Sequence, residues 1–313
     1  MSKGESSKTA VALRQVLQNH TASEIETSKE VIEIDSSVSP ADAAQVLWKN
    51  NILGAPVWDD KQKKYVGFFD MRDILSAVIA SHKAKEEEGD GASLVTTWLG
   101  KMQLTTSYLA ARNPFVFCKA DTPLEEVCSV LAKQTFHRIP IVNDEGRCIS
   151  IISQSALVKF LVAHVEDSLD ETLDEAGMDY RKDIISAKET ASALSVFEML
   201  DSHRLSGIAV VDEEEGQLVG NTSARDIKLV VLSKSNFDAN LDMDIMTYLA
   251  ALRQATPVKN ERHPSAHVAE TSSVGHAIRL LAKTGYHRVF VVDSDVKPIG
   301  VISVADVIRF AVK

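Results

Sequence analysis

The sequence predicts a mixed α/β (α+β) fold made of four copies of one helix–strand–strand–helix unit. A strand–turn–strand–helix pattern recurs four times along the 313 residues, and a Ser/Thr/Asp-rich start with an amphipathic helix precedes it. Four copies are a far more specific signal than one, because each copy must independently place its elements in the same order. The four segments read LGAPVWDDKQKKYVGFFDMRDILSAVI, HRIPIVNDEGRCISIISQSALVKFLV, HRLSGIAVVDEEEGQLVGNTSARDIKLVVL and HRVFVVDSDVKPIGVISVADVIRFAV.

The second copy illustrates each element in order. Thr122 can cap a helix, Pro123 suits its first position, and Glu125 follows three residues after the cap. The short strands RIPIV and CISII flank the turn NDEG and can pair as a hairpin or in a βαβ-related way. The second helix is SALVKFLVAHV. Helical spacing gives the first helix the apolar stripe Leu124, Val127, Val130 and Leu131, and the second helix Leu157, Phe160 and Leu161 with His164 or Val165.

Composition excludes several classes of protein. The net charge of -10, from 34 basic and 44 acidic residues, argues against a general nucleic-acid-binding protein, which needs a basic field. The N-terminus lacks a signal-peptide core, and no apolar run reaches the roughly 18 residues that span a bilayer. Cys118, Cys128 and Cys148 show no CxxC spacing, so we expect reduced thiols. We expect a soluble protein of the cytoplasm, with the nucleus as a further location.

An aspartate recurs where the second strand of a repeat meets its second helix. The tails of the four segments align at Asp73, Ala156, Asp226 and Asp306. A helix N-terminus favours anions, and Ser223, Ser303 and nearby backbone N–H groups can donate to phosphate or hydroxyl oxygens. The aspartates suit pairs of ribose hydroxyls. Each alone could simply complement the helix dipole, but three at one repeat position favour a ligand.

A basic pair opens the apolar run of three repeats. The pairs are His137–Arg138, His203–Arg204 and His287–Arg288, and we expect each at the start of an inner strand. Arginine is permanently charged and histidine can donate a second hydrogen bond, so the pairs suit phosphate. The alternative is that each pair caps the preceding helix C-terminus. If the repeats close around a pseudo-symmetry axis, Arg138 and Arg288 lie close together and bind a shared anion.

This order of elements and the motif G-apolar-apolar-Ser-x-x-Asp resemble the cystathionine-β-synthase (CBS) domain. The resemblance extends from about Ser23 to Lys313 and is clearest at PIGVISVADVIRF. CBS domains work in pairs, so it implies two tandem (Bateman-type) modules in a pseudo-symmetric disc. We expect CBS repeats at residues 23–82, 106–165, 184–234 and 258–313, an N-terminal extension at 1–22, an insertion at 83–105, an acidic linker at 166–183 and a linker at 235–257.

Five stretches narrow the resemblance to the γ subunit of AMP-activated protein kinase and its fungal and plant relatives. They are APVWDDKQKKYVGF, FHRIPIV, ALVKFL, HRLSGIAVVD and YHRVFVVD. The resemblance implies a sensor of AMP, ADP or ATP that needs no metal and that partners a protein kinase catalytic subunit and a scaffold subunit. It places ribose on Asp73, Asp226 and Asp306, and phosphate on His137, Arg138, His287 and Arg288, with His203 and Arg204 contributing less.

Several positions depart from the family pattern. Leu53 stands where the family places an arginine, and Ser155 and Ala156 stand where it places two basic residues. Each charged hydrogen bond contributes roughly 1.5 to 3 kcal/mol, so triphosphate binding should suffer most. Repeat 1 carries Asp70 and Arg72 in place of hydroxyl residues, and an acidic Asp70 repels phosphate. We therefore expect Asp226 and Asp306 to be the main ribose residues.

Three segments do not contribute to this site. Residues 81–98 predict a solvated helix end followed by a mobile connection, and residues 166–183 predict a solvated linker with a short helix. The region around residues 263–276 holds three histidines without metal-ligand spacing, so we expect surface side chains. They are His263, His267 and His276.

The sequence favours a non-catalytic nucleotide-binding regulator. It contains no G-x-x-x-x-G-K-[ST], G-x-S-x-G, H-E-x-x-H or G-x-G-x-x-G motif, and the four repeats leave no room for a catalytic domain. Two alternatives remain. One is a free-standing scaffold with vestigial clefts, which the lost basic residues favour. The other is an enzyme acting on nucleotides that uses Asp70 and Asp73 as a metal-binding carboxylate pair.

Overall fold

Each repeat is built around a small sheet. In the computed structural model, residues 7–27, 30–88, 105–133, 136–166, 169–181, 183–232, 237–255 and 265–313 are described. Repeats 1, 3 and 4 each form a three-stranded sheet, and repeat 2 forms a hairpin. The strands are β1 (Ile34–Asp35), β2 (Gly54–Asp59) and β3 (Lys64–Asp70); β4 (Arg138–Val142) and β5 (Cys148–Ser153); β6 (Ser186–Lys188), β7 (Gly207–Val211) and β8 (Leu218–Ser223); and β9 (His267–Ala269), β10 (Arg288–Val292) and β11 (Pro298–Ser303).

Repeats 1, 3 and 4 share one pattern of strand pairing. The two long strands pair antiparallel as a hairpin, whereas the short leading strand pairs parallel after a helical crossover. In repeat 2 a single parallel bridge between Cys118 and Ile141 takes the place of the short strand. The hairpin alternative is therefore confirmed for RIPIV and CISII, whereas the parallel pairing belongs to a short leading strand that the sequence pattern did not predict.

Each repeat contributes two helices, with further helices before the repeats. The first helices are α2 (Pro40–Lys49), α6 (Leu124–Leu131), α8 (Ala193–Ser202) and α12 (Val274–Thr284). The second helices are α3 (Met71–Glu88), α7 (Gln154–His164), η2 (Ala224–Ile227) continued by α9 (Lys228–Leu232), and α13 (Val304–Ala311). The remaining helices are α1 (Lys8–Asn19), η1 (Ala22–Glu24), α5 (Thr106–Ala111), α10 (Phe237–Asp242) and α11 (Ile245–Ala255).

Serine caps begin three of the four first helices. The hydroxyls of Ser39, Ser192 and Ser273 accept the N–H groups of residues three positions later. The expected cap of α6 is wrong, because Pro123 is its N-cap residue. The Thr122 hydroxyl instead accepts the N–H of Lys119 at 3.0 Å.

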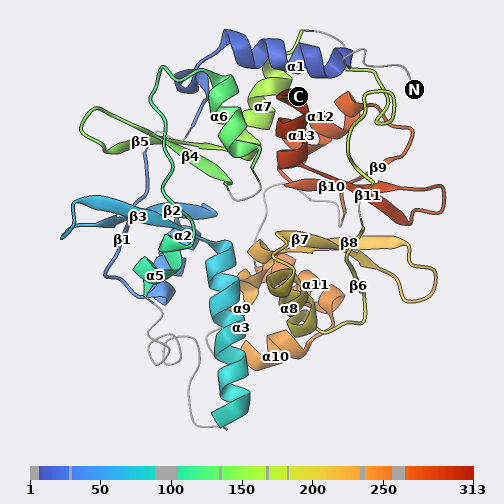
Figure 1. The fold of residues 1–313 in the computed structure, drawn as a ribbon. Helices are drawn as coiled ribbons and strands as arrows, with labels where there is room; N and C mark the ends of the chain where they lie inside the picture. Colours follow the sequence, from blue (N-terminus) through green and yellow to red (C-terminus); the bar gives the residue numbers. More distant parts are fainter. Residues whose placement is uncertain are drawn as a thin grey trace. The chain divides into compact units, whose positions relative to one another are not determined.

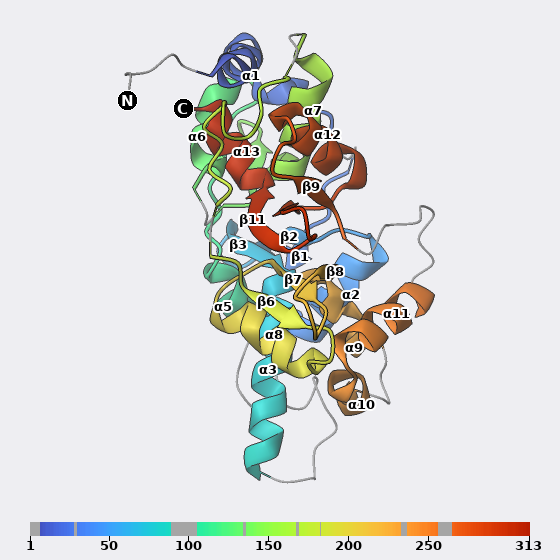
Figure 2. The same ribbon diagram turned by 90° about the vertical axis from the view of Figure 1, so that its right-hand side faces the viewer.

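The chain forms two compact units. Unit 1 comprises residues 1–31, 116–184 and 262–313 and holds repeats 2 and 4, whereas unit 2 comprises 32–115 and 185–261 and holds repeats 1 and 3. In unit 1, α7 packs against α12 and α13, and α1 covers α6 and α13 (Figure 1). In unit 2, α3 packs against η2. It also packs against α8 (Figure 2). The predicted stripe of α7, with Leu157 and Leu161, is buried in the core of unit 1.

The segment that precedes each repeat interacts with the neighbouring repeat. Ahead of repeat 1, Ala22 N–H donates to the Thr122 carbonyl of repeat 2 at 2.9 Å. Ahead of repeat 2, the Thr106 hydroxyl donates to the Val38 carbonyl of repeat 1 at 2.7 Å. Repeats 3 and 4 show the same arrangement. The segment ahead of repeat 3 forms an isolated β-bridge with repeat 4 (Thr172–Ser273), and the segment ahead of repeat 4 forms one with repeat 3 (Ser192–Asp244). This consecutive pairing is the one that two tandem modules predict.

The segment expected to be a solvated linker buries a row of apolar side chains. We call residues 169–181 the strap. Leu169, Leu173 and Tyr180 are at most 1% exposed, so the expectation of a solvated linker is wrong for these residues. Apolar residues at helical spacing alternate with the acidic ones, and the acidic residues concealed them in the sequence.

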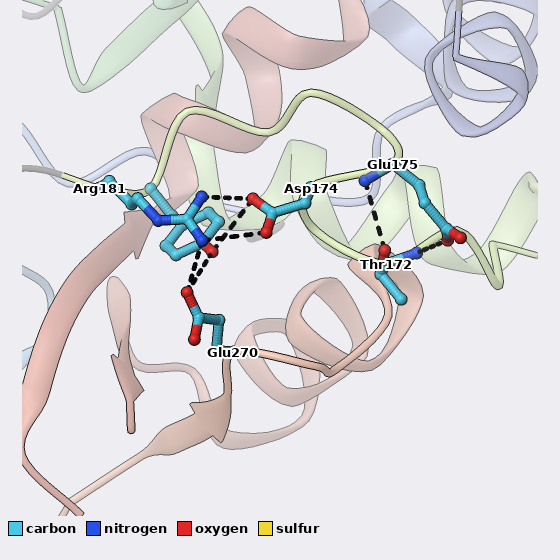
Figure 3. Close-up of polar contacts among 6 residues, drawn as sticks. Thr172, Asp174, Glu175, Arg181 and Glu270 are labelled. Atoms are coloured by element: carbon cyan, nitrogen blue, oxygen red, sulfur yellow. Dashed lines mark hydrogen bonds and ion pairs between the residues drawn. The ribbon is translucent and has the colours of Figure 1, made fainter. Parts of the chain in front are cut away.

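Backbone hydrogen bonds fix the strap to repeat 4. The carbonyls of Leu169 and Tyr180 accept the N–H groups of Gly275 and Val301, both at 2.9 Å. On the strap surface, Arg181 bridges Asp174 and Glu270 (Figure 3). The strap therefore forms part of the core of unit 1 rather than a tether.

Other expectations have mixed outcomes. His267 and His276 are exposed, as predicted, whereas His263 lies outside the described residues. Helix α3 ends at Glu88, which matches the predicted helix end, and residues 89–98 lie outside the described residues. The three cysteines are free, and burial raises the pKa of Cys118 to about 11. Among the described helices, none is long and apolar enough to cross a bilayer.

Candidate functional site

Strand register aligns the four repeats at the end of each hairpin. Arg138 lies opposite Ser153 and Arg288 opposite Ser303. The equivalent pairs are Gly207 with Ser223 in repeat 3 and Gly54 with Asp70 in repeat 1. Each second strand ends one residue before its helix, so the first residue of the inner strand lies beside the helix N-terminus in every repeat.

Two of the three basic pairs occupy this position, and both belong to unit 1. Arg138 and Arg288 are half-buried first residues of β4 and β10. The carbonyls of His137 and His287 accept the first N–H of α7 at 3.2 Å and that of α13 at 3.0 Å. Burial lowers the pKa of Arg288 to about 10, and the charge of Asp306 opposes this shift. Whether the two guanidinium groups share an anion stays a prediction.

The third basic pair lies elsewhere. Strand β7 begins at Gly207, three residues after Arg204, so the expected position at a strand start is wrong for His203 and Arg204. His203 is the C-cap of α8, with its Nδ1 3.0 Å from the Met199 carbonyl oxygen. Arg204 follows in the left-handed region at φ 53°. The helix-capping interpretation describes this pair, because repeat 3 inserts extra residues between the pair and its strand.

Asp226 and Asp306 close capping boxes at the helix starts. Asp306 Oδ2 accepts Ser303 N–H at 2.8 Å and the Ser303 hydroxyl at 2.6 Å. Asp226 Oδ2 accepts Ser223 N–H at 2.7 Å and the Ser223 hydroxyl at 3.1 Å. Burial raises the pKa of Asp226, against these hydrogen bonds. One carboxylate oxygen of each residue thus holds the turn in shape, and a ligand would have to use the other.

Asp73 has a different environment. Its Oδ2 accepts the N–H of Asp70 at 2.9 Å and the side-chain amide of Asn113 at 3.0 Å. The same amide nitrogen also donates to the Phe68 carbonyl at 3.1 Å. Burial and the charge of nearby Asp70 raise the pKa of Asp73. Asn113 comes from the segment after α5, within the expected bounds of repeat 2, so the pattern of repeat 1 alone could not have identified it.

Repeat 2 has no aspartate at this position and uses other hydrogen bonds at the start of its second helix. Ala156 N–H donates to the Ser153 hydroxyl at 3.1 Å, which keeps half of the cap. Gln154 is buried, and its amide donates to the Leu131 and Phe136 carbonyls at 2.9 and 3.1 Å. Gln154 thereby joins the end of α6 to Phe136, the residue that precedes His137.

Arg309 is a further charged residue at the repeat 4 position. It lies one turn after Asp306 on α13, and its guanidinium forms an ion pair with Asp306 Oδ1. Its Nη1 also donates to the Ala132 carbonyl of repeat 2 at 3.4 Å. The sequence signal was an acid–base pair at i,i+3, which is common on helix surfaces and did not single out Arg309.

A family comparison agrees with the four-repeat structure. The model of the CBS domain matches residues 22–80, 108–163, 177–233 and 259–313. The chain belongs to the CBS domain family. The third CBS match begins within the strap, which is consistent with the burial of that segment.

Several CBS relatives are subunits of one kinase. The chain is 26% identical over 310 residues to 5'-AMP-activated protein kinase subunit gamma-3 of Homo sapiens, covering 94% of this chain and 59% of the relative. It is 24% identical over 321 residues to the gamma subunit of Saccharomyces cerevisiae, covering 96% and 92%. The chain thus spans less than two thirds of the human relative's length.

Solved structures show the same fold. A Methanocaldococcus jannaschii protein proposed to be an archaeal homolog of g-AMPK superposes with a TM-score of 0.71 at 18% identity, covering 93% of this chain and 99% of that one. An uncharacterized conserved protein from Pyrococcus horikoshii gives a TM-score of 0.57 at 13% identity, covering 93% and 100%. These matches extend the four-repeat architecture across nearly the whole chain.

Proposed function

We propose that this CBS protein is a non-catalytic, adenine-nucleotide-binding regulator that acts as the energy-sensing subunit of a protein kinase complex. One observation carries the proposal: in unit 1 the two equivalent strand starts carry Arg138 and Arg288, beside helix N-termini and with Asp306 buried at one of them. Cations, helix N-terminal N–H groups and a carboxylate are the groups that bind phosphate and ribose. The kinase gamma subunits among its relatives support the same function.

Each group then has a role in nucleotide binding. Arg138 and Arg288, with His137 and His287, bind phosphate, since guanidinium groups match phosphate geometry in two hydrogen bonds. Asp306 and Asp226 bind ribose hydroxyls. The ligand is AMP, ADP or ATP without a required metal, and the partners are the catalytic and scaffold subunits of a kinase in the cytoplasm.

Calorimetric titration of the nucleotide-stripped protein with AMP, ADP and ATP tests this function. Asp306→Ala and Asp226→Ala should each abolish or weaken a binding event, because each removes an acceptor for ribose hydroxyls. Asp295→Ala is the matched control, because Asp295 lies exposed in the β10–β11 turn of the same repeat as Asp306. Absence of binding to folded wild-type protein would contradict the proposal.

A scaffold without nucleotide binding is the second candidate. It is favoured by repeat 2, where Ala156 supplies no carboxylate, and by Leu53 at the end of the first inner loop. The metal-dependent enzyme has less support, because Oδ2 of Asp73 already accepts the N–H of Asp70 and the side-chain amide of Asn113. Nucleotide turnover that disappears in Asp73→Ala would favour the enzyme instead.

A further inference from the structure

Both carboxylate oxygens of Asp306 already accept hydrogen bonds. Oδ2 accepts the N–H and the hydroxyl of Ser303, and Oδ1 accepts a guanidinium N–H of Arg309. Asp306 is buried, with a side chain 6% exposed. A ribose cis-diol brings two further donors, and each carboxylate oxygen accepts about two hydrogen bonds. Arg309 therefore competes with ribose for the same oxygen.

Repeat 4 alone combines the aspartate with a cation one helical turn later. The residue one turn after the aspartate position is Ser76 in repeat 1, Lys159 in repeat 2 and Leu229 in repeat 3. In repeat 2 the cation has no partner aspartate, because Ala156 stands there. In repeat 3 the residue at this position is the buried, uncharged Leu229.

Arg309 is held by a second repeat and is partly open to water. Its Nη1 donates to the carbonyl of Ala132, the C-cap residue of α6, where a cation complements the helix C-terminus. Its side chain is 32% exposed, so water can solvate the guanidinium once it is released. The ion pair thus joins a buried carboxylate to a guanidinium that is partly open to water.

We infer that Arg309 is a gate at the ribose position of repeat 4. In the ligand-free chain it occupies Oδ1 of Asp306, and a bound nucleoside displaces it. The inference rests on the proposed function, because it assigns the competitor of ribose at the same site. Every ligand that binds Asp306 must break the same ion pair. A ligand with a phosphate can form a new ion pair with the released guanidinium, whereas an uncharged nucleoside cannot. The gate therefore disfavours uncharged nucleosides.

The test compares Arg309→Met with the wild type by calorimetry, using adenosine and AMP. Methionine keeps the length and apolar contacts of the stem but cannot bind the carboxylate. The variant should bind adenosine about three- to tenfold more tightly, with a smaller gain for AMP. Lys159→Met is the matched control: it removes one charge at the equivalent exposed position of repeat 2 and should change neither affinity.

Two outcomes would overturn the gate. Unchanged adenosine affinity in Arg309→Met would show that no competition exists. Weaker AMP binding with unchanged adenosine binding would show that Arg309 is a phosphate ligand instead.

A second measurement separates failure of the gate from failure of nucleotide binding. A double-mutant cycle of Arg309→Met and Asp306→Asn, followed by urea unfolding without ligand, reports the ion pair itself. Asparagine keeps an oxygen that can accept the Ser303 hydrogen bonds. Non-additive stabilities support the occupied state, and additive stabilities contradict the gate even if no nucleotide binds. Absent nucleotide binding with a coupled ion pair contradicts the proposed function and removes the gating role.

Discussion

Asp73 shows how a single buried carboxyl makes stability depend on pH. Burial and the neighbouring Asp70 raise its pKa in the folded chain above the value of about 3.9 in an unfolded one. The folded state then holds a proton that the unfolded state releases. The free energy of unfolding therefore falls as pH rises from about 4 through the raised pKa, and the penalty is fully present above it.

Asp73→Asn should remove this penalty. The amide oxygen can still accept the N–H of Asp70 and the side chain of Asn113. We expect the variant to be more stable than the wild type at pH 8 by about 1 kcal/mol or more, with a smaller difference near pH 5. Urea unfolding at both pH values measures it. A variant less stable than the wild type at pH 8 would mean that the carboxylate is ionised in the fold.

For single residues, the sequence could predict a site role only where the residue recurs at the same position of several repeats. Asp226 and Asp306 were found because one position recurs and a helix start surrounds it. Asn113, Gln154 and Arg309 were missed. Asn113 contacts Asp73 across 40 positions, and Arg309 reaches Ala132 across 177, and local periodicity contains no such information.

The elements differ in how much of them local signals determine. Helices and hairpins followed the predicted order, because caps, turns and apolar periodicity all act within a few residues. The position of His203 and Arg204 was wrong because the sequence could not show which residue begins β7; only pairing of Gly207 with Ser223 sets that register. The strap was missed because its burial depends on repeat 4, which lies far along the chain.

Alanine substitutions of two glycines at equivalent positions test whether the strap packs against β11. A Cβ on Gly300 of β11 would lie 2.5 Å from the Tyr180 carbonyl oxygen, whereas one on Gly220 of β8 would meet Met246 Sδ at 3.5 Å. Gly300→Ala should destabilise the fold by about 1 to 3 kcal/mol, because the strap backbone must move. Gly220→Ala, the control, should change stability by less than about 0.5 kcal/mol.

Thermal and urea unfolding of the two alanine variants measure the difference. Equal stabilities would mean that the strap is not held against β11 in solution. Destabilisation of Gly300→Ala alone would establish that residues 169–181 belong to the folded core.

At the scale of the whole molecule, four-fold repetition identified the architecture but not its internal contacts. The consecutive exchange of leading segments follows from two tandem modules. The grouping of repeat 2 with 4 and of repeat 1 with 3 does not, because it depends on which helix faces meet, such as α7 with α12 and α13. Apolar stripes show that a helix face is buried without showing which partner covers it.

That grouping leads to the last prediction, because it puts Arg138 and Arg288, far apart in the sequence, in one unit. If both bind one phosphate, Arg138→Gln and Arg288→Gln should each weaken AMP binding about 10- to 100-fold, at roughly 1.5 to 3 kcal/mol per charged hydrogen bond. Adenosine binding should change little. Calorimetry of the single and double variants should give non-additive losses, since both side chains serve one ligand. Arg181→Gln, on the strap surface, is the control for loss of charge. Additive losses at two separate binding events would instead assign each arginine its own anion and rule out a shared site.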